Sequence, residues 1–100
     1  MKNQVLKLLT IIVDEALKST IEEEITLLGA KGYTLTQVEG KGTSGERNNA
    51  WVGENIKIET IVAEEISVKI LDLLSDKYFG KYAIIAYCTD VNVMRVDHFI

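Results

Sequence analysis

Residues 6–13 of the chain read Leu6-Lys7-Leu8-Leu9-Thr10-Ile11-Ile12-Val13. Such a run is too short for a helix pattern and too apolar for a strand with one face in water. We interpret it as a central strand of a sheet. Because successive side chains of a strand point to opposite faces, its leucines and isoleucines cannot all meet one covering layer. Both faces of this sheet should therefore be buried.

Two stretches predict amphipathic helices. Asp14 is suited to cap the first, which Gly29 ends. Glu64 and Glu65 suit the first turn of the second, where the helix dipole favours negative charge, and Gly80 ends it. The apolar stripes consist of Leu17, Ile21, Ile25 and Leu28 in the first helix, and of Ile66, Ile70, Leu73, Leu74 and Tyr78 in the second.

Three further segments predict strands. Tyr33–Glu39 and Ile56–Val62 alternate between two faces. The last strand is Tyr82–Cys88, and Val91–Met94 either continues it after a bend or forms a short extra strand. The order β-α-β-β-α-β is typical of a ferredoxin-like sandwich, an α+β fold whose two helices cover one face of a four-stranded antiparallel sheet. Residues 1–100 thus form a single domain, and the face away from the helices should pack on other subunits.

Composition narrows the class of protein. The chain has 100 residues, of which 47% are apolar and 26% charged, as in soluble globular domains. Its net charge of −4 argues against a nucleic-acid partner, because such partners are bound largely by neutralising phosphates. The single cysteine and single histidine, Cys88 and His98, cannot form an internal disulfide or a zinc site unaided. No apolar run approaches the ~20 residues of a membrane helix. We expect a cytoplasmic protein without a metal cofactor.

The segment Lys41–Asn55 does not fit the scaffold. Its fifteen residues are rich in Gly, Ser, Asn and charge, whereas hairpin loops usually have about 2–5 residues. Gly40-Lys41-Gly42 can turn backbone N–H groups toward an anion, and Arg47 can add a second cation. Short Gly-X-Gly runs are common, so on physical grounds alone a mobile hairpin tip is the favoured interpretation.

An ordered set of motifs resembles a known family. The set comprises Gly29-Ala30-Lys31-Gly32-Tyr33-Thr34, Gly40-Lys41-Gly42, Gly45-Glu46-Arg47, Trp51, Asn55-Ile56-Lys57-Ile58-Glu59, Lys77-Tyr78-Phe79, Lys81-Tyr82-Ala83 and Asp90-Val91-Asn92-Val93-Met94-Arg95. Together these motifs resemble the PII-like signalling proteins linked to bicarbonate uptake, namely SbtB and the carboxysome-associated PII proteins. The likeness runs from Lys7 to Phe99.

The resemblance implies a homotrimer whose open sheet faces pack together and whose clefts between subunits bind an adenine nucleotide: AMP, cyclic AMP, ADP or ATP. It also implies a flexible loop at about residues 41–55, the T-loop, which reaches a partner through Arg47 and Trp51. That partner would be a bicarbonate transporter or another component of inorganic-carbon uptake. The nucleotide-binding residues that the resemblance implies are Gly32, Tyr33, Gly40, Lys41, Gly42, Arg47, Gly80, Lys81, Tyr82 and Arg95.

The loop departs from the family at one point that concerns the ligand. Cyanobacterial members commonly read Gly-Lys-Gly-Ser-Arg, whereas this chain continues from Gly42 with Thr43-Ser44. One expected arginine is therefore missing, and with it a charge-assisted contact to phosphate. The preference among the four nucleotides stays open. We expect the loop from Thr43 to Glu54 to be mobile without ligand and to become ordered with nucleotide or partner.

Several single residues have two interpretations. Trp51 can anchor a partner or fold back on its own scaffold, and Arg95 can reach a neighbouring subunit's phosphate or sit in a surface ion pair. Cys88 ends an apolar strand, which favours core packing over catalysis. His98 is interpreted as a surface residue, and Glu22-Glu23-Glu24 as a solvated helix face.

The function that these features favour is a nucleotide-sensing regulator that is not an enzyme, because its anion ligands lie on a loop and not beside a paired acid and base. One alternative is slow hydrolysis of the nucleotide phosphates, with Glu39, Glu46 or Glu59 activating water. Another is a CutA-like metal-linked trimer, which shares the ferredoxin-like plan. The single histidine and cysteine and the Gly-Lys-Gly loop weigh against the CutA-like alternative.

Overall fold

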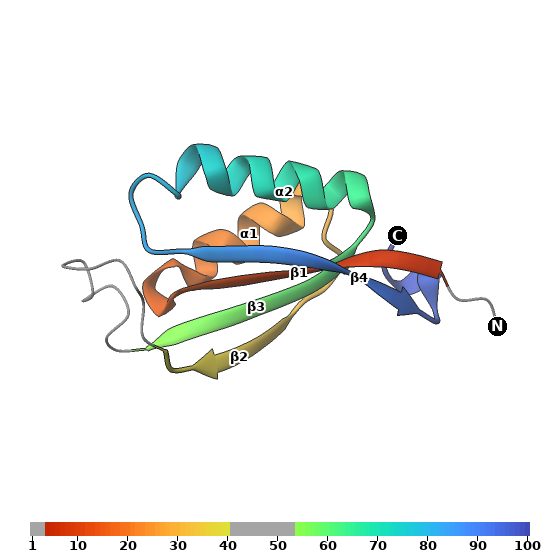
Figure 1. Ribbon diagram of the computed structural model, residues 1–100, viewed down its shortest axis with the longest axis horizontal. Helices are drawn as coiled ribbons and strands as arrows, with labels where there is room; N and C mark the ends of the chain where they lie inside the picture. The colour runs from red at the N-terminus through yellow and green to blue at the C-terminus, as the bar shows by residue number, and fades with distance from the viewer. Residues whose placement is uncertain (1–3, 41–53) are drawn as a thin grey trace.

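The computed structural model describes residues 4–40 and 54–100. Its sheet has four strands in the order β2-β3-β1-β4, and every pairing is antiparallel. Along the chain the elements are β1 (Gln4–Asp14), a 3-10 turn η1 (Glu15–Leu17), α1 (Lys18–Leu28), β2 (Thr34–Val38), β3 (Asn55–Val62), α2 (Glu64–Lys77), β4 (Ile85–Val93) and a 3-10 turn η3 (Val96–His98). This order confirms the predicted ferredoxin-like sandwich (Figure 1).

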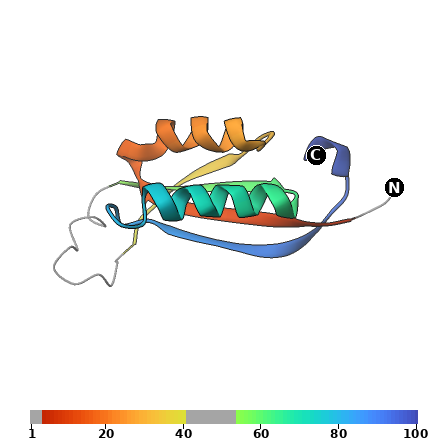
Figure 2. The ribbon, with the colours of Figure 1, turned by 90° about the horizontal axis from the view of Figure 1, so that it is seen from above.

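The central position of β1 agrees with the apolar run from which it was predicted. β1 pairs with β3 from Lys7 opposite Val62 to Asp14 opposite Asn55. On its other side it pairs with β4 from Gln4 opposite Val93 to Ile12 opposite Ile85. Both helices lie along one face of this sheet (Figures 1 and 2).

The hydrophobic core lies between the helices and the sheet. Leu9, Ile11 and Val13 point from β1 toward the helices, as the alternation of the strand requires. β3 contributes alternate residues from Ile56 to Val62, since only its even-numbered apolar side chains share that face. The helices meet these strands with the buried residues Ile21, Ile25, Ile70, Leu74 and Tyr78.

The opposite face of the sheet, which we call the open face, is apolar, and neither helix covers it (Figure 2). Leu6, Thr10 and Val93 are buried on this face, whereas other residues of it are not. Leu8, Ile12 and Ile61 are only half-buried there. The outer strand β4 adds Ile85 and Tyr87, which are 41% and 51% exposed. The predicted combination of apolar strands and an uncovered face is therefore present.

Two predicted boundaries differ from the structure. The last strand begins at Ile85 and not at Tyr82, because the N–H groups of Lys81 and Tyr82 both donate to the carbonyl of Tyr78 and form a turn. That strand continues through Val93 without a break. The predicted loop extended to Asn55, but Asn55 is the buried first residue of β3.

No helix among residues 4–40 and 54–100 is long and apolar enough to cross a membrane.

The strand directions give the sheet two distinct ends. At one, the loop end, β1 and β2 end at Asp14 and Val38, and β3 and β4 begin. At the other, the terminal end, β1 begins at Gln4 and β4 ends at Val93, close to η3. The seven steps between the first and last residues of β3, at ~3.4 Å each, place these ends about 24 Å apart.

Candidate functional site

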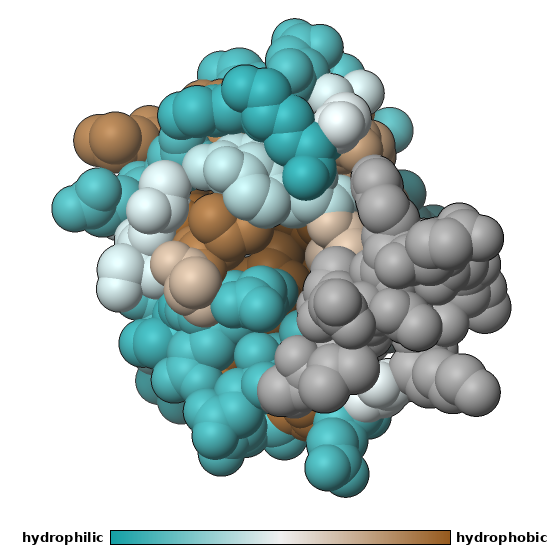
Figure 3. All heavy atoms as spheres, turned by 90° about the vertical axis from the view of Figure 1, so that its left-hand side faces the viewer, coloured by the Kyte–Doolittle hydropathy of each residue, from teal (hydrophilic) through white to brown (hydrophobic). Residues whose placement is uncertain are grey.

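A cavity of about 330 Å³ lies at the loop end. One wall comes from the start of the first helical segment, with Ala16 and Leu17, and the other from the chain leading into β4, with Tyr82 and Ala83. Seen from the loop end, apolar residues lie in a hollow with hydrophilic side chains above and below it (Figure 3). The cavity thus offers an apolar surface with a polar rim.

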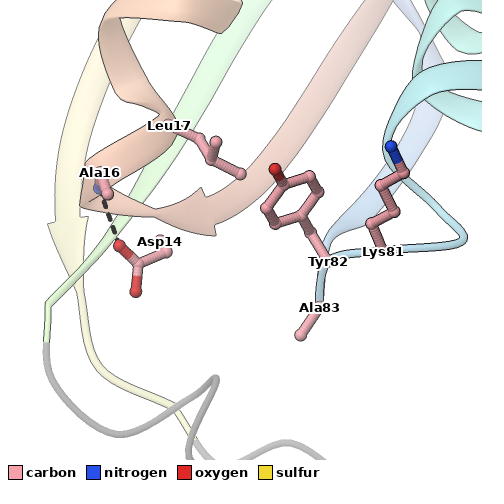
Figure 4. Close-up of a pocket in the computed structure, with 6 residues that line it drawn as sticks. All are labelled: Asp14, Ala16, Leu17, Lys81, Tyr82 and Ala83. Carbon is pink, nitrogen blue, oxygen red and sulfur yellow. Dashed lines mark hydrogen bonds between the residues drawn. The ribbon is translucent and has the colours of Figure 1, made fainter.

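The polar residues of this cavity are Asp14 and Lys81. The carboxylate of Asp14 accepts a hydrogen bond of 2.7 Å from the backbone N–H of Ala16, so it caps the helical segment as predicted. Lys81 extends away from Leu17, whereas the Tyr82 ring points toward it (Figure 4). The lysine therefore supplies a cation to the rim of the cavity and not to its apolar floor.

A turn at the end of α2 presents Lys81 and Tyr82. Their backbone N–H groups each donate to the carbonyl of Tyr78 at 2.9 Å. The rings of Tyr78 and Tyr82 have centroids 5.7 Å apart and are tilted by 47°. Such a tilted pair is a favourable aromatic arrangement. The backbone and the two rings together fix the turn at Tyr78.

The side chain of Tyr78 is itself held by the first helix. Its hydroxyl donates to Oε1 of Glu24 at 2.6 Å, and the ammonium of Lys77 binds the other carboxylate oxygen. Burial raises the pKa of Glu24, but the bonds from Lys77 and Tyr78 outweigh it and bring the pKa below its ordinary value. The interpretation of Glu22-Glu23-Glu24 as a solvated face is wrong for Glu24, because its carboxylate meets α2.

The hydroxyl of Tyr78 should make the fold sensitive to alkaline pH. Burial and the hydrogen bond to Glu24 raise its pKa from 10.0 to about 12. A pKa that is higher in the folded state stabilises the fold fully below pH 10.0, and this stabilisation is lost as the pH rises through 12. Urea unfolding at rising pH should show the loss, and Tyr78→Phe should flatten that part of the curve. Parallel curves for the two proteins would contradict this prediction.

A second cavity, of about 360 Å³, lies toward the terminal end. Gly32 and Tyr33 line it where the chain enters β2, and Phe99 lines it from the end of the chain. The hydroxyl of Thr60 donates to the carbonyl of Gly32 at 2.6 Å and fixes that entry. Glu59 is the one carboxylate among the residues that line this cavity.

The structure divides the predicted nucleotide-binding residues into two groups. Gly40 follows β2 at the loop end, and Gly80, Lys81 and Tyr82 lie at the same end. Gly32, Tyr33 and Arg95 lie toward the terminal end, where Arg95 has the left-handed backbone angles φ 37° and ψ 55°. The remaining predicted residues, Lys41, Gly42, Arg47 and Trp51, lie outside the described residues.

Sequence reasoning missed several residues that line the cavities. Register could have found Glu59 and Ile61, because both lie on the open face of β3 beside Thr10 and Leu8. No local signal marks Phe99, which approaches only through the turn after β4. The other residues that were missed are Asp14, Ala16, Leu17 and Ala83 in the first cavity, and Leu8, Thr34 and Thr60 in the second.

Three single-residue predictions can be compared with the structure. Cys88 was expected in the core, but its side chain is exposed on the outer strand β4, so that prediction is wrong for the single chain. His98 is exposed, as expected. Arg95 makes no ion pair with another described residue, so the surface ion pair finds no support there.

The chain matches a known protein family over nearly its whole length. The model of the family "Nitrogen regulatory protein P-II" matches residues 6–98. The chain belongs to the P-II family. Membership confirms the P-II family and favours it over the CutA-like alternative, whereas the SbtB and carboxysome-associated group stays a prediction.

Solved structures of P-II relatives cover the whole domain. A protein from Thermus thermophilus that is described as a PII-like signalling protein is 44% identical, with a TM-score of 0.86 and 100% coverage of both chains. CPII from Thiomonas intermedia, bound to ADP, AMP and acetate, is 27% identical, with a TM-score of 0.86 over 99% of this chain and 98% of CPII. CPII bound to ADP and bicarbonate is similar at 28% identity, with a TM-score of 0.87 and the same two coverages.

Proposed function

We propose that this P-II chain is a signal-transduction protein that binds an adenine nucleotide between the subunits of a homotrimer and regulates a partner protein. The observation that carries the proposal is the division of the binding residues between the two ends of the sheet. At about 24 Å, this separation is longer than a mononucleotide. Residues of both groups can meet one ligand only when a second copy brings its terminal end to the loop end of the first.

The two ends together supply groups that suit both the phosphates and the base of a nucleotide. Lys81 at the loop end and Arg95 at the terminal end supply cations for phosphates, and Lys41 and Arg47 are further cations in the loop. The aromatic rings of Tyr33 and Phe99 offer flat apolar surface of the kind on which a base packs. Binding of ADP and AMP by the relative CPII supports an adenine nucleotide as effector.

The partner in this proposal is a bicarbonate transporter or another component of inorganic-carbon uptake, contacted by the T-loop through Arg47 and Trp51. The proposal assigns the chain to the group of SbtB and the carboxysome-associated PII proteins, in the cytoplasm or at the membrane beside its partner. CPII, which binds bicarbonate together with ADP, supports a link to inorganic carbon. The nucleotide would act by shifting the loop between conformations that the partner distinguishes.

Titration calorimetry with AMP, cyclic AMP, ADP and ATP tests nucleotide binding. We expect Lys81→Ala to lower the affinity for the preferred nucleotide roughly ten- to hundredfold, since it removes one charge-assisted contact to phosphate. Lys69→Ala removes an exposed lysine from the middle of α2 and serves as the matched control. Equal affinities of the Lys81→Ala and unmodified proteins would remove Lys81 from the site. Absence of binding by the unmodified protein would overturn the proposed function.

The proposal includes no catalysis. Of the carboxylates considered for water activation, Glu39 lies beyond β2 near the loop end, whereas Glu59 lines the cavity toward the terminal end. Incubation with ATP and measurement of released phosphate distinguishes a regulator from a slow phosphohydrolase. If the unmodified protein released phosphate from ATP and Glu59→Gln abolished that release, the result would favour a slow phosphohydrolase.

A further inference from the structure

The turn that presents Lys81 and Tyr82 depends on a residue that lines neither cavity. We propose that Tyr78 is a positioning residue for nucleotide binding, acting through the hydrogen bond that ties its side chain to Glu24 of α1. The inference rests on the proposed function, because it takes Lys81 and Tyr82 to contact the ligand. Tyr78 and Glu24 themselves touch no ligand in this arrangement.

The backbone of Tyr78 joins the helix to the turn. Its N–H donates to the carbonyl of Leu74 at 2.9 Å and closes α2. Its carbonyl then accepts both N–H groups of the turn, from Lys81 and Tyr82, at 2.9 Å each. Any rotation of residue 78 therefore moves the two residues that present a cation and a ring at the loop end.

The side chain of Tyr78 prevents that rotation. It is only 4% exposed, and its hydroxyl donates to a carboxylate oxygen of Glu24. Lys77 binds the second oxygen of the same carboxylate and keeps it directed at α2. Hydrogen bonds to an ionised group are shorter and stronger than neutral ones. The last turn of α2 is thus held to α1 by two charged contacts on consecutive residues.

The ring of Tyr78 also contacts Tyr82 directly. The Tyr78 ring lies 5.7 Å from the Tyr82 ring, and the Tyr82 ring points toward Leu17 in the loop-end cavity (Figure 4). The chain of contacts therefore runs from Glu24 through Tyr78 to Tyr82, and ends at a cavity wall. A change at Tyr78 should alter the shape of the cavity without removing any residue that lines it.

Tyr78→Phe keeps the ring and removes only the hydroxyl, so it isolates the bond to Glu24. We expect amide hydrogen exchange at Lys81 and Tyr82 to quicken roughly tenfold, and the affinity for ADP to fall roughly three- to tenfold. Glu24→Gln keeps an oxygen that can accept a hydrogen bond from the Tyr78 hydroxyl. Exchange at the amides of Lys81 and Tyr82 should therefore stay nearly as slow in this variant as in the unmodified protein. Exchange reports the turn without any nucleotide present.

Ser67→Ala is the matched control for stability. The Ser67 hydroxyl is buried and donates to the carbonyl of Glu64 at 2.7 Å, at the other end of α2. This variant also loses one hydrogen bond of the helix, but it should leave both the exchange of the turn and the affinity for ADP unchanged. If Ser67→Ala lowered the affinity for ADP as much as Tyr78→Phe does, Tyr78 would contribute only to general stability. That result would overturn the inference.

Two further outcomes separate this inference from the proposed function. If Tyr78→Phe left the exchange at Lys81 and Tyr82 unchanged, the inference would be overturned. This holds even if the unmodified protein binds ADP and Lys81→Ala weakens that binding. Quickened exchange with unchanged ADP affinity would overturn it as well, since the turn would then move without effect on binding. If the unmodified protein does not bind ADP or the other nucleotides, the proposed function fails, while exchange still reports whether Tyr78 holds the turn.

Discussion

Replacement of Gly29 by alanine is expected to lower the free energy of unfolding by about 2–4 kcal/mol. Gly29 ends α1 with φ at 128°, a backbone conformation that residues with a Cβ rarely adopt. A Cβ at this position would lie 2.8 Å from Cδ1 of Ile66 on α2. The backbone strain should carry most of this cost, because Cδ1 is the far end of the flexible Ile66 side chain and can move away from the added methyl group.

Urea unfolding of two comparison variants separates these causes. Gly32→Ala introduces the same methyl group where no atom lies within 4 Å, and should change the stability by less than about 0.5 kcal/mol. Ile66→Val removes Cδ1, so Gly29→Ala in that background should lose the overlap and keep the backbone strain. If Gly29→Ala lowered the free energy of unfolding no more than Gly32→Ala does, the strained conformation at Gly29 would be contradicted.

Much of the fold could be predicted because the decisive signals are local. The run Leu6–Val13 needs no tertiary information to be assigned as a central strand, since its apolar residues occupy both faces. Ile56–Val62 alternates cleanly, and the structure buries its four helix-facing residues. Gly29 ends a helix in the conformation that glycine favours. Each of these positions was assigned from its immediate neighbours in sequence.

The errors occur where contacts between distant segments decide the structure. Tyr82 follows Gly80 in an apolar stretch, and only its hydrogen bond to the carbonyl of Tyr78 takes it out of the strand. Glu24 is the last of three consecutive glutamates, and its contacts with Lys77 and Tyr78 distinguish it from the other two. Cys88 faces the same side as the buried Leu9, but it lies on an outer strand and stays exposed.

Sequence reasoning named Gly32, Tyr33, Lys81 and Tyr82, which line the two cavities, but not how these residues are arranged. Nothing in the sequence near Lys81 or Gly32 says that they lie at opposite ends of the sheet. The antiparallel register places them there. The two cavities described above each contain only one of these groups, which is the reason for proposing that a second copy completes the site.

Assembly should therefore depend on the open face, and Ile12→Lys is expected to convert the proposed homotrimer into a monomer. Ile12 is half-buried on that face, between Lys57 of β3 and Ile85 of β4, and lines neither cavity. Its replacement places an ammonium group beside another lysine, in a surface that the proposed homotrimer would bury. Burying an unpaired charge costs several kcal/mol, and a symmetric trimer repeats that cost at each of its interfaces.

Light scattering at micromolar concentration measures the expected change from three chains to one. Val68→Lys introduces the same charge at a residue of α2 that is 50% exposed, and this control should leave the trimer intact. The Ile12→Lys monomer should keep its fold, since the lysine reaches water in a single chain, yet it should lose nucleotide binding because neither end of the sheet holds a complete site. If the monomeric variant bound nucleotide with unchanged affinity, a single chain would suffice for the site. The division of the binding residues between the two ends would then no longer argue for assembly.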